Sequence, residues 1–148
     1  MRPGGVLLVD DNPDDITFVR LAFRTFNMDE ALTALFSGQE AMEYLGGEGL
    51  YADRTKYPIP ALLLLDLRMP MVDGFDVLRW VRSHASLKRL PITIFSASDY
   101  PRDLTLAYDL GANSFLAKPL RLEQFYKTIK SATDFWLESC QLPSMPRT

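Results

Sequence analysis

The sequence predicts an α/β fold in which five parallel strands form one doubly wound sheet with helices on both faces. Short apolar runs alternate along the chain with segments whose apolar residues recur at helical spacing. Several of these apolar runs end directly in an acidic, hydroxyl or basic residue. A length of 148 residues is enough for one domain with a substantial core. We place the domain at residues 1–141 and expect residues 142–148 to form a flexible tail.

The central strand is predicted at residues 61–65, an alanine followed by four leucines. This run ends in Asp66, and a proline and glycine turn comes after it. A short apolar run bounded by turn residues is typical of a strand that is buried on both faces. Residues 6–9 have the same character and end in Asp10 and Asp11, so they predict a second buried strand.

Three more strands complete the predicted sheet, at residues 31–36, 91–95 and 114–117. The fourth strand along the chain ends at Ser96, and the fifth ends at Lys118. Because each strand is followed by a helix, the crossovers give a parallel sheet, and we expect the flavodoxin-like strand order 2-1-3-4-5.

Five helices are predicted after the strands. Asn12 is a good N-cap for the first helix, and Pro13 fits its first turn. Ser37 caps the second helix, which a pair of glycines ends. The third begins at Asp73 and Gly74, and the fourth spans residues 103–110. The buried stripe of the last helix is expected to consist of Leu122, Phe125, Ile129, Ala132 and Trp136.

Residues 48–60 form a connection rich in glycine, tyrosine, proline and charge. We expect it to lack regular structure, and such long connections are often functional or mobile.

Composition excludes several classes of protein. Hydrophobic residues make up 47% and charged residues 24% of the chain, which is ordinary for a soluble globular protein. The net charge of −3 does not suggest a nucleic-acid binder, and no apolar run is long enough to cross a membrane. The start lacks the apolar core of a signal peptide. The single cysteine, Cys140, excludes an internal disulfide, so we expect a cytoplasmic protein.

Polar side chains at the ends of four strands are expected to meet, because the carboxyl ends of parallel strands share one edge of the sheet. They are Asp10, Asp11, Asp66, Ser96 and Lys118. Carboxylates that lie close together repel and require a cation. Oxygen ligands without histidine or cysteine suit Mg²⁺. The set predicts a phosphoryl-transfer site in which Asp66 is the nucleophile.

These residues resemble those of the response-regulator receiver domains of two-component signalling, and the resemblance covers nearly the whole chain. The matching features are the Asp10 and Asp11 pair, Asp66 with Met69, Pro70, Asp73 and Gly74 after it, Ser96 with Ala97, and Lys118 with Pro119.

The resemblance implies a role for each residue of the metal and acceptor site. Asp66 would accept a phosphoryl group from the phosphohistidine of a sensor histidine kinase. Asp11 and Asp66 would bind Mg²⁺ directly, and Asp10 would act mostly through water. The backbone carbonyl of Arg68 would be the third protein ligand.

The resemblance also implies a switch. Ser96 and Lys118 would hold the phosphoryl oxygens, and Phe115 stands where the family keeps an aromatic residue that swings inward when the serine moves. The peptide between Lys118 and Pro119 would be cis, an isomer that is tolerated only before proline. Two positions depart from the family pattern: Arg68 stands two residues past the acceptor, where the family often has a small or amide side chain, and Ser98 stands two residues past Ser96. In the family these positions flank the path of the hydrolytic water, so the lifetime of the phosphorylated state stays open.

A narrower resemblance is to the small regulators that pair with phytochrome-type kinases. It depends on the connection at residues 46–60, the end of the last helix at residues 134–137, and the absence of an output domain. Such proteins pair through the side that runs from strand four to the last helix. Tyr126, Phe135 and Leu137 fall outside the buried stripe of that helix, and we favour a homodimer face over a docking face for a kinase or another partner.

Two other functions stay open. A Mg²⁺-dependent phosphotransferase acting through an aspartyl phosphate usually has a second acid two residues after the nucleophile, where this chain has Arg68. A pseudo-receiver that binds partners without phosphorylation usually lacks the acidic pair, the acceptor or the lysine, and this chain has all three.

Overall fold

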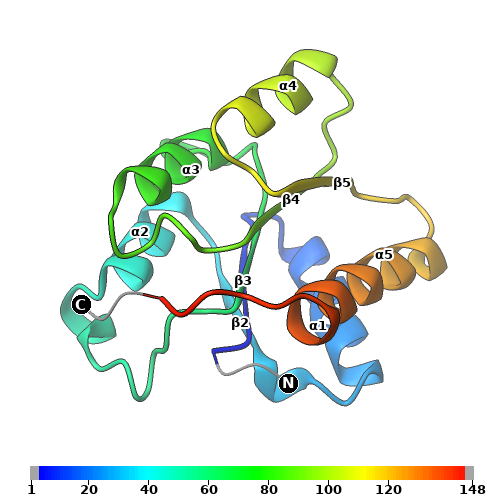
Figure 1. Ribbon diagram of the computed structural model, residues 1–148. Helices are drawn as coiled ribbons and strands as arrows, with labels where there is room; N and C mark the ends of the chain where they lie inside the picture. Colours follow the sequence, from blue (N-terminus) through cyan, green and yellow to red (C-terminus); the bar gives the residue numbers. More distant parts are fainter. Residues whose placement is uncertain (1–3, 146–148) are drawn as a thin grey trace.

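Five parallel strands form a single sheet in the computed structural model, which describes residues 4–145 (Figure 1). The strand order is β2-β1-β3-β4-β5, and this confirms the predicted doubly wound topology. The strands are β1 (Val6–Val9), β2 (Leu32–Leu35), β3 (Leu62–Leu65), β4 (Ile92–Ser96) and β5 (Ser114–Ala117).

Helices alternate with the strands and cover both faces of the sheet (Figure 1). They are α1 (Pro13–Thr25), α2 (Gly38–Gly46), α3 (Gly74–Ser83), α4 (Pro101–Asp109) and α5 (Leu122–Asp134). Short 3₁₀ turns occur at Asp29–Ala31 and Gly49–Ala52. Helix α4 begins two residues before the predicted start, because Pro101 fits the first turn of a helix.

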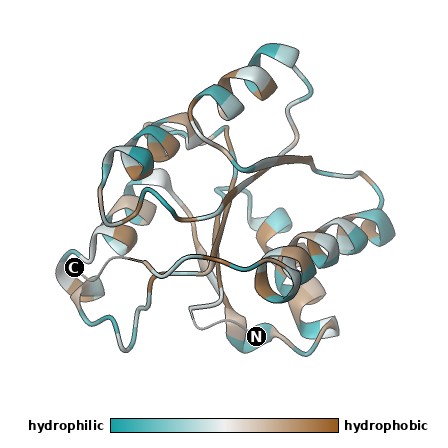
Figure 2. Ribbon diagram, in the orientation of Figure 1, coloured by the Kyte–Doolittle hydropathy of each residue, from teal (hydrophilic) through white to brown (hydrophobic). Residues whose placement is uncertain are grey.

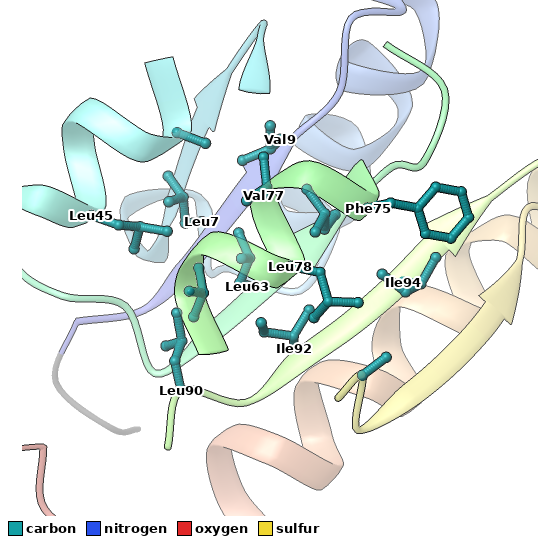
Figure 3. Packing of buried hydrophobic residues seen from close by; sticks show 14 of the residues in the cluster. Leu7, Val9, Leu45, Leu63, Phe75, Val77, Leu78, Leu90, Ile92 and Ile94 are labelled. Carbon is teal, nitrogen blue, oxygen red and sulfur yellow. The ribbon is translucent and has the colours of Figure 1, made fainter. Parts of the chain in front are cut away.

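Two hydrophobic clusters fill the space between the sheet and its helices, one on each face. Alternate strand residues point to opposite faces, so Leu7 and Leu63 join the cluster under α2 and α3, while Leu8 and Leu64 join the cluster under α1 and α5. Figure 3 shows the first cluster, and Figure 2 shows that the strands are the most hydrophobic part of the fold. Burial on both faces explains why the strand sequences are uninterrupted apolar runs.

The end of the last helix departs from the prediction. A π-helical turn at Phe135–Ser139 comes after α5, and the Cys140 amide donates to the Phe135 carbonyl at 2.7 Å. Such a turn holds one more residue than an α-helical turn and so changes which side chains face the core. Leu137 is therefore buried in the core, whereas Trp136 is only partly buried. The expectation that Leu137 lies outside the buried stripe is wrong, because it assumed a constant helical period. Leu122, expected on the stripe, is 48% exposed.

The connection at residues 48–60 is packed against α2, so the expectation of a structureless segment is also wrong. Arg54 donates to the carbonyls of Tyr44 and Leu45 at 2.8 and 2.6 Å, and these carbonyls lie in the last turn of α2. The ends of helices leave such carbonyls without partners inside the helix. The rings of Tyr51 and Tyr57 pack on Tyr44 with centroids 4.9 and 6.1 Å away.

The last described residues return to the body of the domain. Met145 packs against the cluster under α2 and α3. Of the predicted flexible tail, residues 146–148 lie outside the described part of the chain. Between residues 4 and 145, no helix has both the length and the apolar character needed to cross a membrane.

Candidate functional site

Asp10 and Asp66 lie side by side because strands β1 and β3 pair in parallel. Val9 is the partner of Leu65 in this register, and each aspartate comes one residue after its strand. The Asp66 amide donates to the Val9 carbonyl at 3.0 Å, which extends the ladder to the site. Carboxylate oxygens of Asp10, Asp11 and Asp66 lie within 4.8 Å of one another.

The close approach of α3 to the end of β3 also positions Asp66. A Cβ atom added to Gly74 would stand 2.1 Å from the Asp66 carbonyl oxygen, so only glycine allows this approach. The Gly74 amide donates to the Leu67 carbonyl at 3.0 Å, and the Leu67 amide donates to Asp66 Oδ1 at 2.9 Å. Asp73 starts α3 with a reciprocal capping box. The Asp73 and Gly74 motif therefore orients the loop that begins at Asp66.

Lys118 reaches the carboxylates from the end of β5. Its Nζ donates to Asp10 Oδ2 at 2.7 Å and lies 3.7 Å from Asp66 Oδ2. It also donates to Asp15 Oδ2 at 2.8 Å. Asp15 is not among the site residues predicted from the sequence. Its place in the first turn of a helix that begins at the site was the available signal.

The carboxylates of this cluster outnumber its one positive charge, the Lys118 ammonium. Burial raises the pKa of Asp66 to about 6, with the Lys118 ammonium opposing the shift and Asp10 adding to it. Burial also raises the pKa of Asp10. Burial alone would lower the pKa of Lys118, but Asp66 and Asp10 together raise it, so this side chain is an ammonium ion.

A divalent cation fits this site. The facing groups are carboxylates, one lysine is shared among several of them, and the metal-binding set consists of oxygen atoms alone. Hard divalent ions prefer such ligands. The repulsion among carboxylates that helps to raise the pKa of Asp66 is the repulsion that a bound cation would remove.

Ser96 stands next to this cluster as the buried last residue of β4. Its carbonyl accepts from the Lys118 amide at 2.8 Å, and its Oγ accepts from the Ser98 amide at 3.2 Å. Phe115, on β5, packs partly buried against the cluster under α2 and α3. Their roles as switch residues stay predictions.

The peptide between Lys118 and Pro119 is trans, and the described residues contain no cis peptide. The expectation of a cis isomer is therefore wrong for this structure. A peptide before proline prefers trans by only about 0.5–1 kcal/mol, so the sequence does not fix the isomer.

Asp103, on α4, was missed by sequence reasoning. The Arg68 guanidinium donates to Asp103 Oδ2 at 2.5 Å, and the Ser98 hydroxyl donates to the same oxygen at 2.6 Å. The hydrogen bond from Ser98 lowers the pKa of Asp103, and Arg68 lowers it further against the effect of burial. The Arg68 side chain thus points to α4, while its backbone carbonyl as a metal ligand stays a prediction. Nothing in the local sequence marks Asp103, because its charged partner Arg68 lies 35 residues away.

Comparisons with known proteins agree with this geometry. The family model described as the response regulator receiver domain matches residues 6–130. The response regulator Rcp1 of Synechocystis sp. is 34% identical over 142 residues, which cover 96% of this chain and 95% of that protein.

Solved structures give the same result. The phosphorylated cyanobacterial phytochrome response regulator RcpA is 35% identical, with a TM-score of 0.88, and the match covers 95% of this chain and 99% of that one. The Mn²⁺-bound form of Rcp1 has a TM-score of 0.85 at 34% identity, over 96% and 100% of the two chains. With the fold, the acidic cluster and the lysine in place, this chain belongs to the response regulator receiver domain family.

Proposed function

We propose that this chain is a phosphorylation-controlled response regulator that accepts a phosphoryl group on Asp66 from a sensor histidine kinase. The observation that carries the proposal is the meeting of Asp66, the acidic pair Asp10 and Asp11, and the Lys118 ammonium at one edge of the sheet. The relatives support it, because one of them is described as a phosphorylated response regulator.

The chemistry follows from the positions of these groups. A carboxylate oxygen of Asp66 attacks the phosphorus atom, the bond between phosphorus and the histidine nitrogen breaks, and an acyl phosphate forms. The Leu67 amide holds Oδ1 of Asp66, and the Lys118 ammonium faces Oδ2. Lys118 and Ser96 would donate to the transferred phosphoryl oxygens.

We propose Mg²⁺ as the cation. Asp11, Asp66 and the Arg68 carbonyl would bind it directly, and Asp10 would act through water because Lys118 and the Asn12 amide already occupy its oxygens at 2.7 and 2.9 Å. When bound, Mg²⁺ would neutralise the charge of the carboxylates and of the phosphoryl oxygens. The Mn²⁺-bound structure of Rcp1 supports a divalent ion in this chain.

Phosphoryl uptake from acetyl phosphate tests the proposal. Intact-protein mass spectrometry should show the mass of one phosphoryl group added in Mg²⁺, and no addition in EDTA, because the carboxylates and the phosphate donor repel without the cation. An unchanged mass in Mg²⁺ would contradict the proposed function, and equal uptake in EDTA would contradict the metal.

An apolar hollow next to the site is our candidate for kinase docking. Its lining consists of Asp15, Phe18, Pro119, Leu120, Leu122 and Phe125, and its volume is about 260 Å³. Five of the six lining residues are apolar, so the hollow suits a few apolar side chains of a protein partner. One of the lining residues, Asp15, also binds Lys118, so the hollow adjoins the acceptor. We propose that an apolar helix face of the kinase packs here and brings its histidine to Asp66.

Substitution of Leu120 tests this docking surface. Leu120 is fully exposed, so Leu120→Asp should leave the fold and the reaction with acetyl phosphate unchanged. Transfer from the phosphorylated kinase should slow by about 10-fold or more, because burying a leucine contributes about 1.5–3 kcal/mol. Leu50→Asp is the matched control, since Leu50 is 69% exposed on the connection that packs against α2. Equal transfer rates for the wild type and Leu120→Asp would exclude this surface.

We also propose a phytochrome-type kinase as the partner and a homodimer through the side that runs from β4 to α5. The phytochrome response regulator RcpA supports the first. Exposed Leu104 and Tyr108 on α4, and Phe135 just beyond α5, support the second. A cytoplasmic location fits both proposals. Sedimentation of the wild type with and without acetyl phosphate tests the dimer, and a monomer in both samples would contradict it.

A further inference from the structure

Asp103 joins the two loops that flank the proposed acceptor. Arg68 is two residues beyond Asp66, and Ser98 is two residues beyond Ser96. Both donate to the same carboxylate oxygen, Oδ2 of Asp103, at 2.5 and 2.6 Å. Because one oxygen accepts from both donors, a movement of either donor away from Asp103 breaks a charge-assisted hydrogen bond.

Asp103 is buried, whereas its partner Arg68 lies largely at the surface. Its side chain is 6% exposed, whereas that of Arg68 is 57% exposed. The carboxylate therefore stays fixed in the fold, and the arginine reaches it from the surface. The Arg68 guanidinium passes 5.9 Å from the ring centroid of Phe75, which also limits its range.

Ser98 also connects Asp103 to Ser96. The Ser98 amide donates to Ser96 Oγ at 3.2 Å, and Ser98 Oγ accepts from the Tyr100 amide at 3.4 Å as it donates to Asp103. A movement of Ser96 toward a phosphoryl group would carry Ser98 with it and would pull against Asp103.

We propose that Asp103 is a positioning residue of the switch, which holds Arg68 and Ser98 in the resting arrangement and opposes the movement of Ser96 toward the phosphoryl group. This inference depends on the proposed function of Asp66. Contacts that are present only in the resting state weaken the binding of every ligand that requires the other state. Loss of the contacts should therefore tighten the binding of a phosphoryl mimic.

Beryllofluoride with Mg²⁺ is the probe, and its dissociation constant is measured for the wild type, Asp103→Asn, Arg68→Gln and the double variant. Each single variant should bind roughly 5- to 10-fold more tightly, within the usual range of coupling between sites. The double variant should gain no more than Asp103→Asn alone, because that substitution already weakens the contact that Arg68→Gln removes.

The two single variants separate this inference from simple charge effects. Arg68→Gln removes a positive charge near an anion site, so electrostatics alone predicts weaker binding, the opposite sign. Asp109→Asn is the matched control for Asp103→Asn, because Asp109 is exposed on the same helix and its substitution changes the net charge equally. It should bind like the wild type.

Thermal unfolding shows whether each variant is folded, and the dissociation constants are compared only among folded variants. If Asp103→Asn does not fold, the test depends on Arg68→Gln alone. This variant should fold, because the Arg68 side chain is largely exposed. Folded variants that bind the probe as the wild type does, or more weakly, overturn the inference. A wild type that does not bind the probe overturns the proposed function instead.

Discussion

Asp66→Asn should abolish phosphoryl uptake from acetyl phosphate and from the phosphorylated kinase. The amide cannot act as the anionic nucleophile, and it removes the negative charge of one proposed metal ligand. Asparagine is nearly the same size as aspartate, so it should fit at this position, where Asp66 is only 7% exposed, and the fold should be intact. Intact-protein mass spectrometry in Mg²⁺ measures the result.

Asp14→Asn is the control for this experiment. Asp14 is an exposed carboxylate at the start of α1, and its substitution changes the net charge equally. This variant should be labelled as fully as the wild type. Full labelling of Asp66→Asn would mean that another residue accepts the phosphoryl group, and the proposed mechanism would be wrong.

The same substitution, Asp66→Asn, should stabilise the metal-free protein at neutral pH. Burial raises the pKa of Asp66 from 3.8 to about 6 in the folded state. Between these values the folded state binds more protons than the unfolded state, so wild-type stability falls as the pH rises through this range. At neutral pH the carboxylate is ionised and destabilising, and Asp66→Asn should raise the free energy of unfolding by about 1–3 kcal/mol.

Urea unfolding in EDTA at neutral pH and at about pH 4 measures this effect, and the gain should be much smaller at the lower pH. Added Mg²⁺ should stabilise the wild type more than Asp66→Asn, because the variant lacks one anionic ligand. Asp14→Asn should show no gain at either pH. A variant less stable than the wild type in EDTA would show that the ionised Asp66 contributes favourably to the fold.

The part of the site that strand order controls was predictable from the sequence. Each strand is a short apolar run, and the polar residue that ends it marks the edge of the sheet. Once the strands are parallel, Asp10, Asp66 and Lys118 must come to the same edge, even though the lysine lies 108 residues from Asp10. Local pattern and one rule of topology were sufficient for this.

The sequence did not reveal side-chain partners that depend on how separate elements pack. Asp15 and Asp103 each resembled an ordinary acidic residue in the first turn of a helix. Their bonds to Lys118 and Arg68 exist because those helices stand beside particular loops in three dimensions. The order of residues along the chain does not show which side chains of separate elements come close together.

By itself, the sequence determined the five strands, their order and the convergence of the acidic pair, Asp66 and the lysine. Only the tertiary structure decided the burial of Leu137, the anchoring of residues 48–60 by Arg54 and the link from Arg68 to Asp103. Burial in a strand follows from neighbours in sequence. A bond between a loop and a distant helix, or a turn with one residue more, follows from how separate elements pack against one another.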